Sequence, residues 1–152
     1  MSVGEYCNRE VVVAEKVTSV REAAQLMRQF HAGDLVVVER RGNDNIPVGI
    51  VTDRDMVIEV LAEDVSPDQV TLADLMCTEL ATVQEKEELW VVLDRMRLLG
   101  VRRMPVVNDK GALVGILTMD DAVELISEAL SDMAQLVRRE IKEEVRKRPL
   151  VP

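Results

Sequence analysis

The chain has 152 residues, 47% hydrophobic and 31% charged, which is the composition of a soluble globular protein with one compact unit or two small domains. Aromatic residues make up only 2% of it, so the interior must be aliphatic and base stacking on aromatic rings is almost unavailable. The net charge of −9 repels a phosphate backbone, which argues against nucleic acid or an anionic membrane surface as a partner.

Targeting and redox signals are also missing from the sequence. The first residues lack the basic and then apolar pattern of a secretory signal. The longest uninterrupted apolar run, from Leu89 to Leu93, is far shorter than the ~20 residues of a membrane span. Two cysteines, Cys7 and Cys77, do not make a disulfide framework. We therefore expect a cytoplasmic protein with no membrane partner, whose two thiols lie in the core or in an interface.

One unit of the sequence occurs twice. The stretch from Gly49 to Asp55 returns as Gly115 to Asp121, and Met27-Arg28 returns as Met96-Arg97. Even Cys7 falls opposite Cys77 in this alignment. Repetition at such a period indicates a duplicated structural unit, here about 60 residues long.

Each unit carries the pattern of a short strand, a helix, two strands and a second helix. The first helix of each unit has apolar residues at 3.6-residue spacing, and the strands are short β-branched runs separated by polar turns. In chain order, the first unit has a strand at 11–13, a helix at 20–30, strands at 35–38 and 48–51, and a helix from Asp53. The second has a strand at 80–83, a helix at 89–99, strands at 104–107 and 113–117, and a helix from Met119.

The linker and the C-terminal tail set the domain boundaries. Residues 62–71 are polar and contain Pro67, which marks a break, and residues 72–76 then open the second unit as a short helical turn. Helical spacing of apolar residues continues as far as Arg146, so the last helix is long. We divide the chain into repeat 1 (1–65), repeat 2 (66–130) and a C-terminal helical extension (131–152).

The extension indicates a homodimer. Residues 138–148 carry six basic and three acidic side chains, and basic residues at a helix C-terminus complement the helix dipole. A helix that projects beyond the core with an apolar stripe needs a partner, which we expect to be a second copy of the chain.

The duplication also predicts the fold. A sheet of two or three short strands with helices on one face cannot bury its apolar surface alone, but two such units can do so by packing sheet to sheet. We expect an α+β fold in which two β-α-β-β-α repeats form a pseudo-two-fold pair with a cleft between them, followed by the extended C-terminal helix.

Thr52 and Asp55, and their counterparts Thr118 and Asp121, stand at the start of the last helix of each unit. One interpretation is a capping box, in which hydroxyl and carboxylate accept hydrogen bonds from unpaired backbone N–H groups. The other is a nucleotide site, because a helix N-terminus favours phosphate and a carboxylate can accept two hydrogen bonds from ribose hydroxyls. A single copy favours the cap, whereas its repetition at matched positions favours the nucleotide.

The duplicated unit closely resembles the CBS domain, which is named after cystathionine β-synthase and occurs in tandem as a Bateman module. The resemblance covers about residues 2–130. Its most specific stretches are Val-Gly-Ile-Val-Thr-Asp-Arg-Asp at 48–55, Gly-Val-Arg-Arg-Met-Pro-Val-Val at 100–107 and Leu-Val-Gly-Ile-Leu-Thr-Met-Asp-Asp at 113–121. With no added catalytic or channel domain in the sequence, the chain looks like a stand-alone CBS pair.

The resemblance implies an adenosine-bearing ligand in the cleft: AMP, ADP or ATP foremost, and also S-adenosylmethionine or NADH. Asp55 and Asp121 would then hold ribose hydroxyls, and Thr52 and Thr118 would contact phosphate with help from Arg54. The adenine would lie against the early strand and the start of the next one, at Ala81, Thr82, Met104 and Pro105 in the second site and at Val12, Val13 and Val36 in the first. We expect no resident cofactor and no protein-held metal, since Mg²⁺ would arrive with ATP.

The two copies differ where a ligand would bind. Arg102 and Arg103 in the second copy would attract a phosphate, whereas Asp34, at the matching place in the first copy, would repel it. Thr82 is replaced by Val12, which has no hydroxyl. We therefore expect unequal clefts, with adenine recognition favoured in the second.

The sequence predicts a non-catalytic sensor that signals to an unknown regulated protein. His31 is the only histidine, and we expect it at the surface or in a turn, so a catalytic relay has at most one possible base. Zinc-ligand spacing and a Walker-type loop are both missing. The main alternative is a structural interaction module whose clefts are empty and whose Thr/Asp pairs only cap helices.

Overall fold

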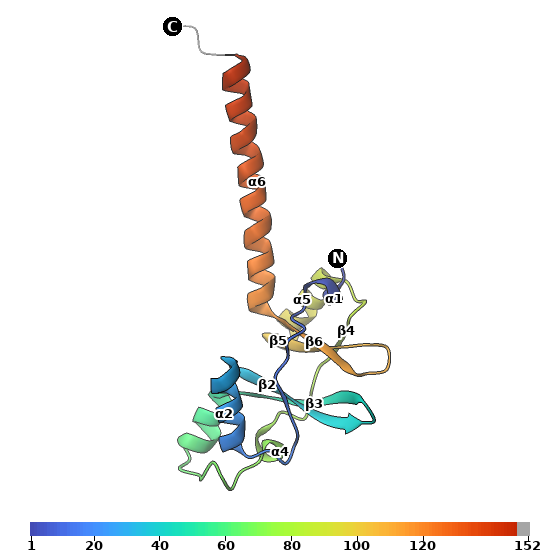
Figure 1. Ribbon diagram of the computed structural model, residues 1–152, viewed down its shortest axis with the longest axis vertical. Helices are drawn as coiled ribbons and strands as arrows, with labels where there is room; N and C mark the ends of the chain where they lie inside the picture. The colour runs from blue at the N-terminus through green and yellow to red at the C-terminus, as the bar shows by residue number, and fades with distance from the viewer. Residues whose placement is uncertain (149–152) are drawn as a thin grey trace. The chain divides into compact units, whose positions relative to one another are not determined.

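The structure is a computed structural model that describes residues 1–148. The chain forms two compact units. The first, Met1–Thr118, holds all the strands found in the described residues, and the second, which begins at Met119, is a single long helix (Figure 1).

The first unit contains the duplicated elements in the expected order. Its first half consists of α1 (Val3–Tyr6), β1 (Val13–Ala14), α2 (Val20–Phe30), β2 (Asp34–Arg41), β3 (Asp44–Thr52), α3 (Asp53–Met56) and the π-helix η1 (Val57–Leu61). Its second half consists of α4 (Leu72–Leu75), β4 (Val83–Gln84), α5 (Leu89–Leu99), β5 (Arg103–Val107) and β6 (Leu113–Thr118). The predicted α+β fold with two packed repeats and an extended C-terminal helix is confirmed.

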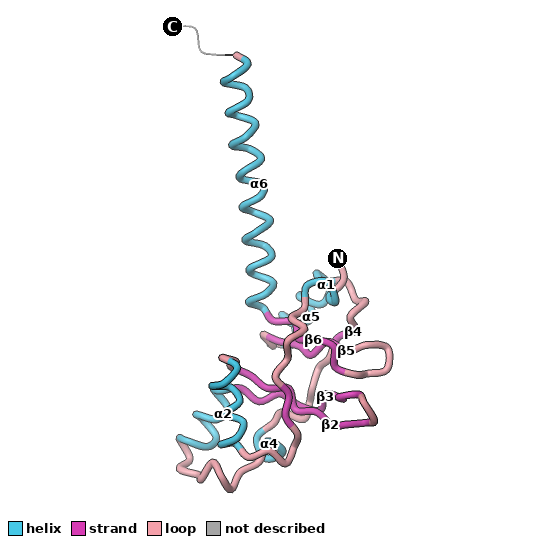
Figure 2. Tube along the Cα trace, viewed as in Figure 1, coloured by secondary structure: helices cyan, strands magenta, loops and turns pink. Residues whose placement is uncertain are grey.

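Both repeats build the same three-stranded sheet, in the orders β1-β2-β3 and β4-β5-β6 (Figure 2). The first strand of each sheet is parallel to the second, and the second is antiparallel to the third. Even the register shifts match, since each lies in the middle strand of its sheet, between Val37 and Val38 and between Val106 and Val107. The opening strands β1 and β4 are shorter and start later than predicted, because only their last residues join the ladder.

The core is aliphatic, as the lack of aromatic residues requires. In the first repeat, Ala23 and Met27 of α2 pack against Leu35 and Val51 of the sheet. Between the two sheets, Val36 and Val38 of β2 pack against Ile116 of β6. Burying these side chains on both faces of each sheet removes apolar area from water, which joins the repeats into one unit.

The helix ends explain why α2 starts and stops where it does. Ser19 accepts a hydrogen bond from the Glu22 N–H at 3.2 Å, and the Glu22 carboxylate accepts one from the Ser19 N–H at 3.1 Å, which is a capping box. His31 ends the helix in the left-handed conformation with φ of 52°, at the place that Gly100 occupies after α5. The prediction that His31 is a surface turn residue is therefore confirmed.

Each repeat contributes a short segment to the other. Val3 donates its backbone N–H to the Glu87 carbonyl, and Asn8 pairs with Ile116, so the segment that holds α1 lies on the second repeat. In the reverse direction, Cys77 pairs with Ile50, and the segment that holds α4 lies on the first repeat. Figure 2 shows the chain running from α1 beside the second sheet down to the first sheet. The two repeats are thus interleaved.

Glycine is required where these crossing segments pass over the sheets. A Cβ atom built on Gly115 would lie 2.6 Å from the Cys7 Sγ and 2.9 Å from the Asn8 carbonyl oxygen. A Cβ on Gly49 would lie 2.8 Å from the Met76 Sδ. The two glycines occupy equivalent positions in β6 and β3, so the duplication repeats the close approach together with the segment that makes it.

The cysteines lie at equivalent places with different exposure. Cys7 is buried against β6, as expected for a core thiol, but Cys77 is exposed. Cys77 is therefore not a core thiol, and its expected place in an interface stays a prediction.

The second unit is α6 (Met119–Lys147), a helix of 29 residues that would be about 44 Å long at 1.5 Å per residue. It agrees with the long helix expected from the sequence, and the last part of the predicted extension, 149–152, lies outside the described residues. None of the helices described in residues 1–148 is long and apolar enough to cross a lipid bilayer.

We predict that Gly115→Ala destabilises the protein by about 1–3 kcal/mol, because the new methyl group overlaps Cys7 and Asn8 and forces the crossing segment to move. The measurement is the denaturation midpoint in urea. Gly33→Ala is the matched control, because its Cβ would make an ordinary 3.4 Å contact with Asp53. Equal midpoints for Gly115→Ala and the wild type would show that the close passage does not constrain the fold.

Candidate functional site

A cavity of about 460 Å³ lies in the first unit between residues of the two repeats. The first repeat supplies Ile50 and Thr52 from β3 and Asp55 from α3. The lining residues that follow the linker are Cys77, Glu79, Leu80, Ala81, Leu99, Val101, Arg102 and Arg103. The volume is that of a site for a small ligand, and an apolar wall with a few charged groups is the usual composition of such sites.

Thr52 and Asp55 form a capping box at the wall of this cavity. The Asp55 N–H donates to the Thr52 Oγ1 at 3.1 Å, and the Thr52 N–H donates to the Asp55 Oδ2 at 2.8 Å. Both side chains are partly exposed. The capping interpretation of this pair is therefore correct as geometry. It leaves room for a ligand, because a carboxylate has about four acceptor positions and this cap uses one oxygen.

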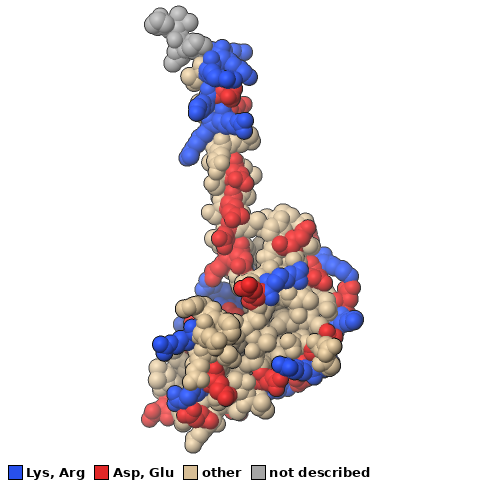
Figure 3. Space-filling view, in the orientation of Figure 1, with Lys and Arg blue, Asp and Glu red and all other residues tan. Residues whose placement is uncertain are grey.

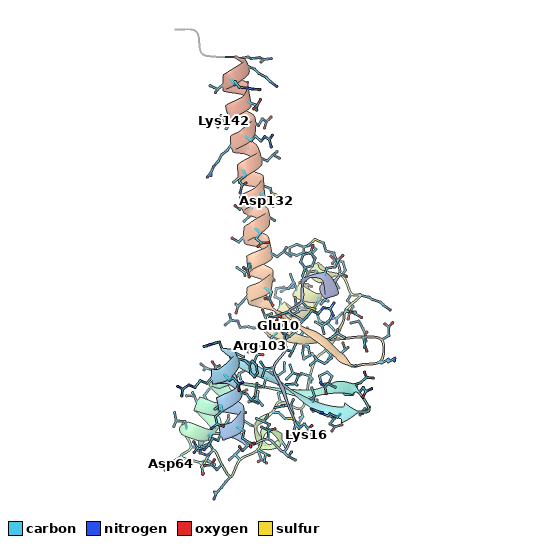
Figure 4. All side chains as sticks on the ribbon, in the orientation of Figure 1. Glu10, Lys16, Asp64, Arg103, Asp132 and Lys142 are labelled. Atoms are coloured by element: carbon cyan, nitrogen blue, oxygen red, sulfur yellow. The ribbon has the colours of Figure 1, made fainter. Side chains whose placement is uncertain are left out.

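An ion pair joins the two repeats beside the cavity. The Arg103 Nη1 donates to the Asp34 Oδ2 at 2.6 Å, and the side chains are 28% and 24% exposed. Arg103 lies at the start of β5, where the second sheet approaches the first repeat (Figure 4). Asp34 stands at the same position of β2, so two residues in equivalent places of the repeats pair with each other. The sequence comparison assigns Asp34 to the first copy and Arg103 to the second, and the structure pairs the two side chains.

Some of the other residues predicted to bind the ligand line this cavity, and others lie outside its lining. Ala81 lines the cavity together with Arg102 and Arg103. Thr82 is exposed, and Met104 and Pro105 are buried in β5, so none of these three belongs to the lining. Arg54 is exposed in α3 and is not part of the lining either.

A second cavity of about 570 Å³ holds two of the residues predicted for the first site. Val12 and Val13 line it, whereas Val36 is fully buried in β2. The remaining lining residues are Glu10, Val11, Leu26 and Phe30. Its lining contains one carboxylate and no basic side chain, so the two cavities differ in charge as the sequence comparison suggested.

The second Thr/Asp pair is placed differently. Thr118 is the last residue of β6 and of the first unit, and Asp121 lies in the first turn of α6 in the second unit. Neither is in the lining of either of the two cavities described above.

Sequence reasoning missed part of the wall of the 460 Å³ cavity. Cys77, Glu79 and Leu80 reach it because the segment after α4 crosses onto the first repeat, where Cys77 pairs with Ile50. The available signal was the recurrence of Cys7 as Cys77 and of Gly49 as Gly115 at equivalent positions of the two repeats. Two glycines and two small side chains that recur together indicate a close backbone approach.

Residues 1–148 contain no cluster of three or more His, Cys, Asp or Glu side chains that could hold a metal ion. The charged side chains in the lining of the 460 Å³ cavity are Asp55, Glu79, Arg102 and Arg103. Two arginines beside a carboxylate at a helix start suit an anionic ligand that also carries hydroxyl groups.

Solved structures share this architecture. The CBS domain pair of protein MJ0100, solved with 5′-methylthioadenosine and S-adenosyl-L-methionine, is similar with a TM-score of 0.73 and 26% identity over 85% of this chain and 98% of that one. A CBS domain protein from Pyrobaculum aerophilum complexed with AMP is similar with a TM-score of 0.70 and 26% identity over 80% of this chain and 89% of that one.

Sequence comparison gives the same result. An uncharacterized protein of Methanopyrus kandleri is 36% identical over 125 residues, which are 82% of this chain but only 62% of that relative's length. The family model of the CBS domain matches residues 3–62 and again residues 72–128. Two matches that together cover most of the sequence, on two copies of one fold, show that the chain belongs to the CBS-domain family as a tandem pair.

Proposed function

We propose that the protein is a non-catalytic sensor that binds an adenosine-bearing ligand in the cavity of about 460 Å³. The observation that carries this proposal is the composition of the cavity wall, which combines Thr52 and Asp55 of one repeat with Ala81, Arg102 and Arg103 of the other. Similar CBS pairs hold AMP or S-adenosyl-L-methionine, which supports a ligand of this class.

Each lining group has a role in the proposed complex. Asp55 accepts hydrogen bonds from the ribose hydroxyls while it continues to cap α3. Thr52 and the arginines lie where they could meet the phosphate or another anionic group. Leu80, Ala81 and Val101 supply apolar surface for the adenine. If the ligand is ATP, it brings its own Mg²⁺, which prefers phosphate oxygens and water to an all-protein cage.

The ion pair between Arg103 and Asp34 sets the charge that the ligand meets. Asp34 already balances one of the two arginines, so the pair competes with a ligand phosphate for the Arg103 guanidinium. A ligand with few phosphates, or a neutral or zwitterionic adenosyl ligand, therefore fits the cavity better than one with three phosphates.

Signalling follows from the position of the cavity between the repeats. A ligand that contacts both repeats stabilises the arrangement in which those contacts form, and a regulated protein that prefers this arrangement is then bound more tightly.

A second candidate function is a structural interaction module without a ligand. The observation that favours it is the complete capping box of Thr52 and Asp55, which accounts for both side chains without a nucleotide.

We predict that AMP, ADP, ATP, S-adenosylmethionine or NADH at millimolar concentration raises the melting temperature, because a ligand that binds only the native state stabilises it by mass action.

Asp55→Ala should weaken binding of the active ligand about tenfold or more, since it removes hydrogen bonds to a charged acceptor. The control is Asp74→Ala, which removes the same kind of cap, between Asp74 and Thr71, away from the cavity. A flat panel, or equal weakening by both variants, would favour the ligand-free module.

We predict that Asp34→Asn strengthens binding of AMP relative to adenosine, because it frees Arg103 for the phosphate. The fold should lose less than about 1 kcal/mol, as expected for a partly exposed ion pair. The measurement is isothermal titration with both ligands. Asp68→Asn serves as the control, since it breaks the exposed pair of Asp68 with Arg21 outside the cavity. An unchanged ratio of the two affinities would remove Arg103 from phosphate recognition.

We propose further that the protein is a homodimer held through α6, because this helix exposes a row of large apolar side chains. The predicted result of deleting residues 138–152 is a lower mass in light scattering. Deleting only 149–152 provides the control and should leave the mass unchanged. Equal masses for the longer deletion and the full chain would remove α6 from the dimer contact.

A further inference from the structure

We infer that α6 pairs with α6 of a second copy of this chain in antiparallel orientation, centred near Met133. This inference rests on the proposed homodimer and adds the direction of the helices to it. The observations behind it are the exposed apolar stripe of α6 and the separation of its charges into two halves of opposite sign.

The apolar stripe runs along nearly the whole helix. Its members are all between 40% and 63% exposed: Val123, Ile126, Leu130, Met133, Val137, Ile141 and Val145. They recur every three or four residues, which places them on one face. Over 22 residues this spacing averages about 3.7, close to the 11-residue repeat that gives a right-handed supercoil of paired helices.

The charges of α6 are divided along its length. Residues 119–135 carry five acidic and no basic side chains, a net charge of −5, and residues 136–148 carry six basic and three acidic ones, a net charge of +3. Figure 3 shows the acidic side chains gathered on the half of the helix nearer its N-terminus and the basic ones on the other half. Asp132 and Lys142, labelled in Figure 4, belong to the two halves.

This division favours one orientation of a helix pair. Paired helices lie about 8–10 Å apart, which is comparable to the Debye length at physiological salt, so whole halves interact. A parallel pair would set −5 beside −5 and +3 beside +3. An antiparallel pair sets −5 beside +3 at both ends and also opposes the two helix dipoles.

The stripe is consistent with this orientation as well. Met133 is its middle member, with Val123, Ile126 and Leu130 before it and Val137, Ile141 and Val145 after it. Reversing the helix about Met133 therefore sets apolar residues against apolar residues along the contact, with Ile126 near Ile141 and Leu130 near Val137.

An anionic membrane surface is a poorer partner for the same face. Its charge would repel the half of α6 that carries −5, whereas a second copy attracts both halves.

The first experiment reverses the charge of the basic half. Arg138→Glu, Arg139→Glu and Lys142→Glu together change it from +3 to −3, which turns both attractions of an antiparallel pair into repulsions. In a parallel pair the repulsion between these halves would stay the same, because +3 faces +3 in the wild type and −3 faces −3 in the variant. We expect the dimer dissociation constant, measured by analytical ultracentrifugation, to rise at least tenfold and the effect to shrink at high salt.

The matched control keeps the charge and changes the side chains. Arg138→Lys, Arg139→Lys and Lys142→Arg should leave the dissociation constant within about twofold of the wild type. Circular dichroism checks that each variant retains its helix content. If only the Glu variant loses helix, the spin-label distances decide the orientation of the helices instead.

The second experiment measures the orientation directly. Spin labels are placed at Arg146→Cys in a full-length chain with Cys7→Ala and Cys77→Ala. Position 146 lies 13 residues from Met133, so the two labels of an antiparallel dimer should be about 40 Å apart, whereas a parallel pair would hold them within about 20 Å. A label at Asp132→Cys should give a short distance in either case and shows that α6 forms the contact.

The outcomes separate the two proposals. A long distance at 146 with a short one at 132 supports the antiparallel pair. Short distances at both positions, or a dimer unaffected by the Glu variant, overturn it and leave the homodimer standing. A wild-type chain that stays monomeric at high concentration overturns the homodimer itself. Binding of that monomer to anionic vesicles through α6 would identify a membrane surface as the partner of the apolar stripe instead. The ligand titrations are independent of all these results.

Discussion

The close passage of one chain segment over the sheet of the other repeat is the constraint on which the first unit depends. Gly115 and Gly49 permit it, because a methyl group at either position would overlap the crossing segment. That passage brings α1 to the second repeat and α4 to the first, and each crossing segment pairs with the last strand of the other repeat's sheet. It also carries Cys77 and the residues after it to the wall of the 460 Å³ cavity. The fold and the candidate site therefore share one cause.

The Thr-x-x-Asp motif shows how one structure can serve two purposes. In Thr52 and Asp55 it closes the start of α3, and in Thr71 and Asp74 it closes the start of α4 in the same way. Only the first pair stands at a cavity that also holds arginines. Chemistry alone cannot separate a cap from a ligand site here, because both need an acceptor beside unpaired N–H groups. The surroundings of the pair make the difference.

Duplication gave the two repeats equivalent positions, and later divergence made them complementary. Asp34 and Arg103 stand at the same place in β2 and β5, yet one is acidic and the other basic, and they meet across the repeats. A symmetric pair of either charge would repel at this point. Divergence of this kind explains why only one of the two cavities is lined by basic side chains.

The sequence by itself determined the duplicated unit, the order of its elements, the start of the helices at Asp53 and Met119, and the length of the last helix. These follow from local periodicity and from matches within the chain, which need no knowledge of contacts. The resemblance of its motifs to the CBS family was also legible, and the family comparisons agree with it.

Only the tertiary structure decided which residues share a site. Thr52 and Arg103 lie far apart in the sequence and meet because the sheets pack and the crossing segments interleave. Met104 and Pro105 are buried in β5 and outside the cavity lining, since a strand between two packed layers turns its side chains into the core. Spacing along a chain predicts which face a side chain takes within its own element. Which residues of other elements contact that face depends on the packing of the whole unit.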